Sequence, residues 1–135
     1  MDVSVKKLFA LCPANKAWGP EPINKSEINK AIQEARFFDP KTEPEGYIKT
    51  RKDHVERIAW FVKYGWTDPI QIDLFCYVGH IIIDGNHRAC AAKFLKHKKI
   101  KAEISGAIDS LENCLMNKFN KKLKLAPQLV STQKE

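Results

Sequence analysis

The stretch from residue 53 to residue 106 constrains the fold most, because its apolar spacing alternates between helical and strand-like. A helix is predicted from Asp53, with Glu56 completing a capping box, to the residue before Gly65. Two strands follow, at 70–75 and 80–84, then a second helix at 86–97 and a third strand at 100–104. The strand over 80–84 is apolar on both faces, which predicts a central position. This order predicts an α/β (α+β) fold, a small mixed sheet flanked by helices.

The joint between the second strand and the second helix, Asp84-Gly85-Asn86-His87-Arg88, carries the chemistry of this sequence. Gly85 lets the backbone turn sharply and lets a ligand approach it closely. The helix that follows directs unpaired amides and the positive end of its dipole into the gap. Arg88 adds a two-pronged donor suited to phosphate, and His87 adds a group that titrates near neutral pH. The joint therefore predicts a phosphate site formed by Gly85, Asn86, His87 and Arg88.

Length and charge exclude several classes of protein. The chain has 135 residues, 44% of them hydrophobic, which suits one domain with its own core. Its formal net charge of +7 makes polyanions the natural partners. No stretch approaches the ~20 apolar residues of a membrane span, so no membrane partner is expected. The short apolar run over 8–12 is predicted to be a first strand.

No functional role is predicted for the cysteines or for two of the histidines. The cysteines form no C-x-x-C pair and have no zinc spacing with the histidines, which predicts free thiols in a reducing cytoplasm. They are Cys12, Cys76, Cys90 and Cys114. His54 and His80 are predicted to lie on the surface or in turns.

Outside the central stretch the pattern is less regular. Residues 1–52 contain five prolines and one predicted helix, 25–36, which Asn24 or Ser26 could cap. A loop is predicted over 38–51, and the whole segment is expected to pack on the core or to cover it as a lid. The chain is expected to form a single domain of four segments: 1–52, 53–106 (the core), 107–126 (a C-terminal helix) and 127–135 (a flexible tail).

Residues 53–105 resemble the core of the ParB/sulfiredoxin-like superfamily, to which the ParB-like N-terminal, or "ParB-like nuclease", domain belongs. The helix that ends in Gly65-Trp66 before Pro69-Ile70 resembles the family's passage into its first core strand. Residues 84–92 resemble its G-x-x-R-x-x-A box. The resemblance implies the family's fold and a nucleotide, ATP or CTP, whose phosphates bind at the 84–88 turn, in association with DNA or RNA.

Each branch of that family differs from this sequence at the box. Sulfiredoxins carry a reactive Cys where this chain has Asn86, so sulfiredoxin activity is not expected, and Cys90 lies about one helical turn further on. The partition proteins have Glu-Arg in place of Asn86-His87, and their DNA-reading and dimerisation regions do not fit after residue 106. The free serine kinases share the other box residues and use an acidic residue from the N-terminal half, for which Glu43 and Glu45 are candidates.

Further charged and aromatic residues extend the candidate site. Asp84 and His87 are the catalytic candidates, and Asp84, with Asp73 or Glu103, could hold Mg²⁺ beside a triphosphate. Aromatic residues of the first helix and its end are predicted to pack in the core or along the helix, whereas Trp18 and Tyr47 are freer to stack on a base. The packing aromatics are Trp60, Phe61, Tyr64 and Trp66. Five lysines around the box helix predict either a basic rim for nucleic acid or nucleotide phosphates, or a solvated face. They are Lys93, Lys96, Lys98, Lys99 and Lys101.

Three functions follow from these observations. The first is a nucleotide-binding module linked to DNA or RNA transactions. The second is a small enzyme: an ATP-dependent phosphotransferase or ATPase of the free-serine-kinase type, or a metal-dependent nuclease. The third is a protein-interaction domain that binds no nucleotide. A homodimer is compatible with each of them.

Overall fold

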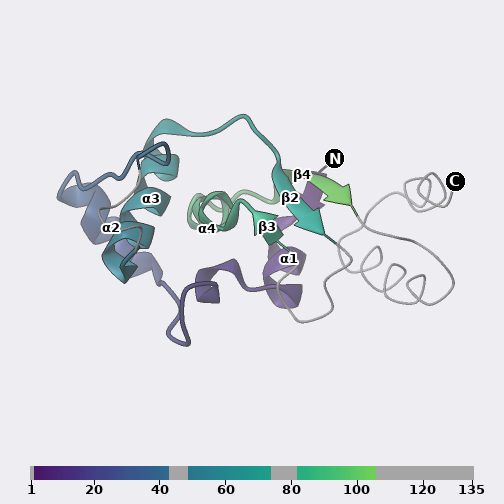
Figure 1. The fold of residues 1–135 in the computed structure, drawn as a ribbon, viewed down its shortest axis with the longest axis horizontal. Coiled ribbons are helices and arrows are strands. Elements are labelled where there is room, and N and C mark those ends of the chain that lie inside the picture. Colours follow the sequence, from purple (N-terminus) through teal and green to yellow (C-terminus); the bar gives the residue numbers. More distant parts are fainter. Residues whose placement is uncertain (1, 43–48, 74–81, 106–135) are drawn as a thin grey trace, which may run out of the picture.

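The structure, a computed structural model, describes residues 2–42, 49–73 and 82–105. These ranges form a mixed arrangement of helices and strands (Figure 1). In chain order the elements are β1 (Asp2–Ser4), α1 (Val5–Leu11), the 3-10 helix η1 (Ala14–Lys16), α2 (Lys25–Gln33), α3 (Arg51–Tyr64), β2 (Ile70–Asp73), β3 (Ile82–Asp84), α4 (Asn86–Phe94) and β4 (Lys99–Ser105). None of the helices in these ranges combines the length and the apolarity needed to cross a membrane. The predicted C-terminal helix and tail, 107–135, lie outside the described residues.

The described strands form one mixed sheet in the order β1–β4–β2–β3. β2 and β4 run parallel, whereas β1 and β3 pair antiparallel with β4 and β2. The mixed α/β class is therefore confirmed. The central position predicted for the strand over 80–84 is wrong in this sheet, because β3 lies at its edge and Ile83 is 60% exposed. A continuous apolar run can form an edge strand of which only one face is covered. In β3 that face carries Ile82, which is buried.

The N-terminal apolar run forms a helix, so the strand predicted over 8–12 is wrong. Ser4 caps α1, because its hydroxyl accepts a hydrogen bond from the Lys7 amide at 3.2 Å. Val5, Leu8 and Phe9 are buried at the i, i+3, i+4 spacing of one helical face. The first strand is the shorter segment before this cap, β1.

The two longer N-terminal helices begin at capping boxes. Asn24 caps α2 together with Glu27, which decides between the two caps predicted for this helix. Thr50 caps α3, and Asp53 is the third residue of its box, so the predicted start at Asp53 is about one turn late. Gly65 ends α3 as predicted, with a positive φ of 76°.

The box helix α4 is shorter than predicted, because its last turn closes early. The His97 amide donates to the Ala92 carbonyl at 2.9 Å, and the Lys96 amide donates to the Lys93 carbonyl at 3.0 Å. These two bonds form a Schellman motif, with Lys96 in the left-handed position at φ 61°. Three residues predicted to be helical, 95–97, therefore turn the chain toward β4.

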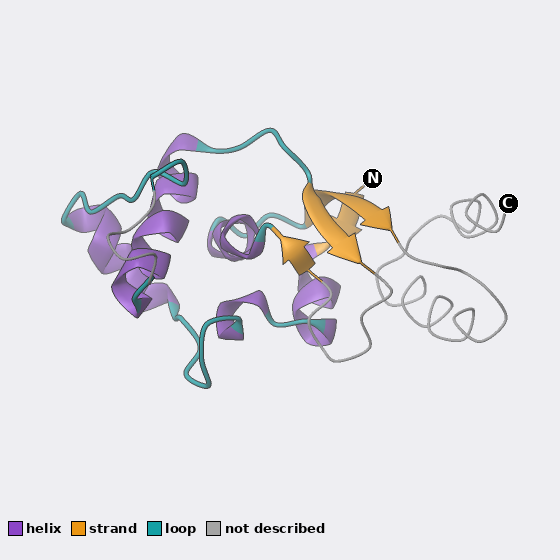
Figure 2. Ribbon diagram, viewed as in Figure 1, coloured by secondary structure: helices purple, strands orange, loops and turns teal. Residues whose placement is uncertain are grey.

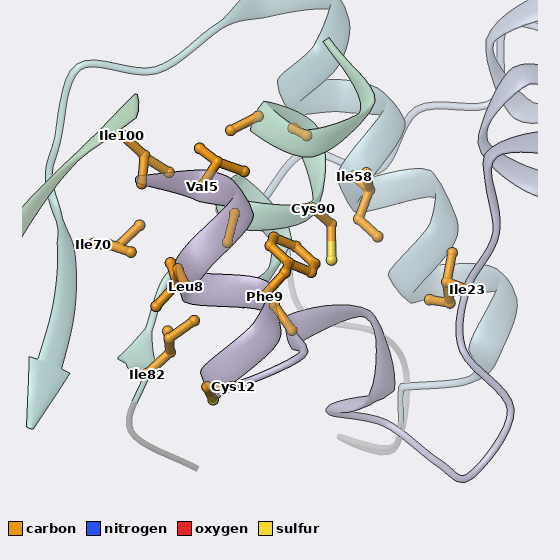
Figure 3. Close-up of a cluster of buried hydrophobic side chains, with 14 of the residues drawn as sticks. Val5, Leu8, Phe9, Cys12, Ile23, Ile58, Ile70, Ile82, Cys90 and Ile100 are labelled. Carbon is orange, nitrogen blue, oxygen red and sulfur yellow. The ribbon is translucent and has the colours of Figure 1, made fainter. Parts of the chain in front are cut away.

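A single cluster of buried side chains holds these elements together. Helix α4 lies between the α2–α3 pair and the sheet (Figure 2). Its alanines Ala89, Ala91 and Ala92 are at most 1% exposed, and their small size allows close packing on both sides. Side chains of α1 fill the space between α4 and the strands (Figure 3). The cluster draws residues from both sides of the predicted boundary at 52.

Candidate functional site

The predicted phosphate turn is built as a tight strand-to-helix joint. β3 ends at Asp84, and Gly85 takes a left-handed conformation, with φ 110° and ψ 18°, as the N-cap of α4. A Cβ atom at this position would lie 2.4 Å from Cγ2 of Ile70. Gly85 is therefore required both by its backbone conformation and by the close approach of β2. It has no side chain to cap the first-turn amides of α4, so they remain suited to an external acceptor.

Arg88 points back into the protein and fastens this joint. It is 8% exposed, and its Nη1 donates to the carbonyls of Asp68 at 2.8 Å and Pro69 at 3.0 Å. Its Nη2 donates to Oδ2 of Asp84 at 3.1 Å, while the Asp84 side chain stays 72% exposed. Arg88 thus positions the segment before β2 and orients the Asp84 carboxylate. A direct contact between Arg88 and a phosphate stays a prediction.

His87 belongs to a partly buried ring stack that the sequence does not indicate. Its Nε2 lies 2.9 Å from Nδ1 of His54, so one nitrogen donates and the other accepts. Trp18 stacks on both imidazoles, with ring centroids 4.4 Å apart in each case. The surface or turn position predicted for His54 is wrong, because His54 is 8% exposed at the α3–α4 contact. Trp18, which was predicted to be free to stack on a base, stacks instead on His54 and His87 of the protein itself.

Burial keeps both imidazoles neutral. Desolvation, reinforced by the charge of Lys49, lowers the pKa of His54 to about 4. Desolvation, reinforced by the neighbouring His54 and by Arg57, lowers the pKa of His87 to about 3. At neutral pH the pair is therefore uncharged, and His87 offers hydrogen bonds rather than a positive charge to a ligand.

A cavity of about 750 Å³ lies at the start of α4. The box supplies Asp84, Gly85, His87 and Arg88 to its wall, which brings together four of the five predicted box residues. Its volume falls in the range of small-molecule sites, about 300–1,000 Å³. The predicted core aromatics Trp60, Phe61 and Trp66 also line it, and the last two of them pack against the core as well.

Arg57 brings a buried positive charge to the same cavity. It is 5% exposed, and its guanidinium donates to the carbonyls of Pro40 and Thr42 and lies 4.4 Å from the Phe38 ring centroid. Among the described residues no carboxylate pairs with it, and its Nε, buried as well, has no hydrogen-bond partner. Lys41 and Lys49 line the cavity beside it. This wall of the cavity is cationic.

A second part of the cavity lining is a row of oxygen-bearing side chains across three strands. Gln71 on β2 is in register with Asp84 on β3 and with Glu103 on β4, so all three residues share one face of the sheet. Gln71 Nε2 donates to Oε2 of Glu103 at 3.2 Å. All three residues line the cavity. This acceptor row suits the hydroxyl or amino groups of a ligand.

The described residues do not by themselves assemble the predicted magnesium site. In the ranges that the structure describes, no three His, Cys, Asp or Glu side chains form a group that could hold a metal ion. Asp84 and Glu103 lie on either side of Gln71, whereas Asp73 does not line the cavity. A role for Asp84 in holding Mg²⁺ stays a prediction, in which phosphate oxygens would complete the ligands.

The five lysines predicted to form a basic rim are separate from the cavity at the box. Lys93, Lys96, Lys98 and Lys99 line a second hollow, which shares no lining residue with the cavity. Lys101, on the strand β4, is exposed and lines neither. α4 runs between the two sites, about 10 Å from Asn86 to Lys93 at 1.5 Å per residue. The rim therefore does not lie beside the phosphate turn.

The remaining predicted residues have simple outcomes. Cys12 and Cys90 are free, buried thiols, and burial raises the pKa of Cys90 to about 12, so it carries no thiolate at neutral pH. Tyr64 is 58% exposed and contacts Phe37 and Trp60, so it lies outside the core. Six further residues named from the sequence lie outside the described ranges: Glu43, Glu45, Tyr47, Cys76, His80 and Cys114.

Arg57 and Gln71 line the cavity although the sequence pattern did not predict them as site residues, and His54 lies in the interior although a surface or turn position was predicted. A signal for two of them exists, because His54 and Arg57 lie three residues apart, on the side of α3 that carries buried Ile58. Polar residues within an apolar helical face indicate a buried polar site. Gln71 carries no such signal, since an outward-facing polar residue in a strand is ordinary.

Comparison with known proteins adds no assignment, because no family model, no curated protein and no solved structure matches this chain. The resemblance to the ParB/sulfiredoxin-like superfamily therefore stays a prediction, which rests on the helix-to-strand passage and on residues 84–92.

Proposed function

We propose that the protein binds a nucleotide, ATP or CTP, in the cavity at the start of α4. The observation that carries this proposal is the buried guanidinium of Arg57, without a carboxylate partner among the described residues, in the cavity lining that also contains Gly85. A buried charge that is not paired is unfavourable, and a bound anion would compensate it. The resemblance of residues 84–92 to the G-x-x-R-x-x-A box supports the same class of ligand.

The phosphates are assigned to the cationic wall. The first-turn amides of α4 and the positive end of its dipole favour an anion, and the absence of a Cβ at Gly85 allows a close approach. Arg57 and Lys41 add positive charge from a different part of the chain. In this arrangement Arg88 acts as a positioning residue, because its donors hold Asp84, Asp68 and Pro69.

The nucleoside is assigned to the rest of the cavity. Trp60, Phe61 and Trp66 offer ring surface against which a base can stack. Glu103 and Gln71, which also line the cavity, can accept hydrogen bonds from ribose hydroxyls, as carboxylates do in many nucleotide sites. A ligand with an anionic end and a hydroxyl-bearing end therefore matches the two walls.

Calorimetry with two kinds of ligand, nucleotides and pyrophosphate, and with two variants tests this assignment. Wild-type protein is titrated with ATP and CTP and with inorganic pyrophosphate, which has the phosphates without the nucleoside. Glu103→Gln keeps the shape of an exposed side chain and should weaken nucleotide binding about tenfold without changing pyrophosphate binding. Arg57→Lys keeps the charge but alters the donors, and it should weaken both ligands.

The control is Lys30→Gln, which removes an exposed charge of α2 that does not line the cavity. It should bind both ligands as the wild type does, and thermal melts should show that all variants are folded. If neither nucleotide nor pyrophosphate binds the wild type at sub-millimolar concentration, the proposal fails and the protein-interaction domain becomes the better reading. If Lys30→Gln weakens binding as much as Arg57→Lys does, the cavity is not the site.

A second candidate function is phosphoryl transfer or nucleotide hydrolysis with Asp84 as the base. One observation favours it: the Asp84 carboxylate is 72% exposed and lines the cavity, while Arg88 fixes its orientation. Release of ADP from ATP over time, lost in Asp84→Asn while nucleotide binding remains, would support an enzyme. Binding without any release would leave the protein a nucleotide-binding module.

A further inference from the structure

The second hollow, which we call the lysine groove, has an unusual charge distribution. It has a volume of about 530 Å³ and lies where α1 begins and α4 ends. Five lysines line it, and its described lining contains no Asp or Glu. They come from two segments far apart in the sequence: Lys6 from α1, and Lys93, Lys96, Lys98 and Lys99 from the end of α4 and the start of β4.

Backbone hydrogen bonds hold this cluster of like charges in place. The Val5 amide donates to the Lys98 carbonyl at 3.0 Å, which ties the start of α1 to the turn before β4. The Schellman motif at the end of α4 fixes the backbone of Lys96 and His97 in the same turn. The lysines are thus gathered by the fold, although their mutual repulsion opposes it. A bound polyanion would relieve this repulsion.

The shape of the groove favours one nucleic-acid strand over other polyanions. A hollow of about 530 Å³ has room for a short piece of one sugar-phosphate backbone, whereas a duplex is too large to enter it and could bring only one of its two backbones to it. The surface is hollowed, whereas a lipid bilayer presents a flat surface, which matches a hollow poorly. Lysine heads suit phosphates contacted without sequence preference.

The apolar floor of the groove argues against reading of the bases. Phe9 is 8% exposed, and Nζ of Lys93 lies 4.6 Å from its ring centroid, so the ring is covered rather than open for stacking. We infer that the lysine groove binds the phosphate backbone of single-stranded nucleic acid, independently of the nucleotide cavity. This inference goes beyond the proposed function and does not depend on it, because the two hollows share no lining residue.

The test is fluorescence anisotropy of a labelled oligo-dT of about 12 nucleotides in a salt series from about 50 to 200 mM NaCl. The double variant Lys96→Gly, Lys98→Gln removes two charges from the groove. Gly at position 96 suits the left-handed conformation at φ 61° better than Lys does, so the fold should be kept. We expect binding to weaken at least tenfold, and the slope of log affinity against log salt to fall by about 1.4.

The matched control is Lys16→Gln, Lys30→Gln, which removes the same charge from exposed positions outside the groove. It should keep both the affinity and the salt slope within about twofold of wild type, in line with loose non-specific attraction. Equal losses in the two double variants would overturn the inference, because net charge alone would then explain binding. Arg57→Lys should bind the oligonucleotide normally, which separates a failure here from a failure of the nucleotide cavity.

Competing ligands define the class of partner. An unlabelled duplex of the same length, an acidic peptide and vesicles containing phosphatidylserine are added in turn to the labelled complex. A single strand should displace the probe best. Stronger displacement by duplex, peptide or vesicles, or a flat salt response of the wild type, would show that the groove is not a single-strand site.

Discussion

Two independent requirements select glycine at position 85: the backbone conformation and the lack of space for a Cβ atom. Its φ of 110° suits glycine, and a Cβ would overlap Cγ2 of Ile70 at 2.4 Å. The sequence indicates the first requirement, because glycine between a strand and a helix predicts a sharp turn. It cannot indicate the second, because the approach of β2 to this turn is a contact between distant parts of the chain.

Replacement of this glycine should therefore be more damaging than replacement of another glycine with positive φ. Gly85→Ala is expected to lower the free energy of unfolding by about 2–5 kcal/mol, from backbone strain and overlap together. Gly65→Ala is the matched control, because its φ is 76° but nothing lies within 4 Å of the added Cβ. It should lower the free energy by about 1 kcal/mol, from strain alone. Urea denaturation of both variants measures the difference, and equal losses would contradict the overlap.

At the scale of elements, local signals predict where helices end better than which strands are neighbours. Gly65 and Asn24 mark ends of α3 and α2 that the structure confirms, because caps act within a few residues. The run Leu8–Cys12 is too short to distinguish a helical period from a strand period, and burial of one helical face decides it. The edge position of β3 depends on strand pairing across the sheet, which the apolar pattern of one strand does not contain.

The candidate site shows the same difference between local signals, which can be read from the sequence, and contacts between distant segments, which cannot. The box side of the cavity comes from one continuous segment, 84–88, and was therefore predictable from motif and turn chemistry. The other lining residues that matter, Lys41, Arg57 and Gln71, come from three other segments. They meet the box because α3 packs on α4 and β2 pairs with β3, so only the tertiary structure brings them together.

The contact between α3 and α4 should make stability depend on pH below neutrality. The pKa of His54 falls to about 4 and that of His87 to about 3 in the folded protein, against an ordinary value of 6.5. Above pH 6.5 both states are neutral, so the full contribution is present there. As the pH falls from 6.5 toward 4 and then 3, the unfolded chain takes up protons first and stability is lost. Asp53 favours protonation of His54, whereas Lys49 and Arg57 oppose it.

The loss should reach up to about 1.4 kcal/mol per pH unit for each imidazole. Urea denaturation at a series of pH values between 7 and 4.5 measures it. In the double variant His54→Gln, His87→Gln, the stability should change less over this range, even if it starts lower. His97→Gln, at an exposed histidine, is the control and should follow the wild type. A wild-type profile that is flat between pH 6.5 and 5 would contradict buried, neutral imidazoles.

For the whole molecule, the positive charge is unevenly placed. The chain carries +7 overall, and the described part gathers five lysines in one groove without an acidic residue in its lining. Elsewhere some of the cations have acidic partners: Arg36 with Glu34 and Glu56, and Arg51 with Glu27. The groove is therefore a concentrated source of repulsion in the folded state.

Moderate salt should stabilise this protein, because screening weakens the repulsion within the groove more than it weakens the short, partly buried ion pairs. Between about 20 and 200 mM NaCl we expect a gain of about 1 kcal/mol, which raises the midpoint of thermal unfolding by about 4 °C for a chain of this length. Lys96→Gly, Lys98→Gln should have a higher midpoint at low salt and a smaller gain. Lys16→Gln, Lys30→Gln changes the net charge equally but leaves the groove intact, so its gain should stay close to that of the wild type. A midpoint that falls as salt is added would mean that attractive ion pairs dominate, and that the lysines of the groove are too well solvated to repel one another.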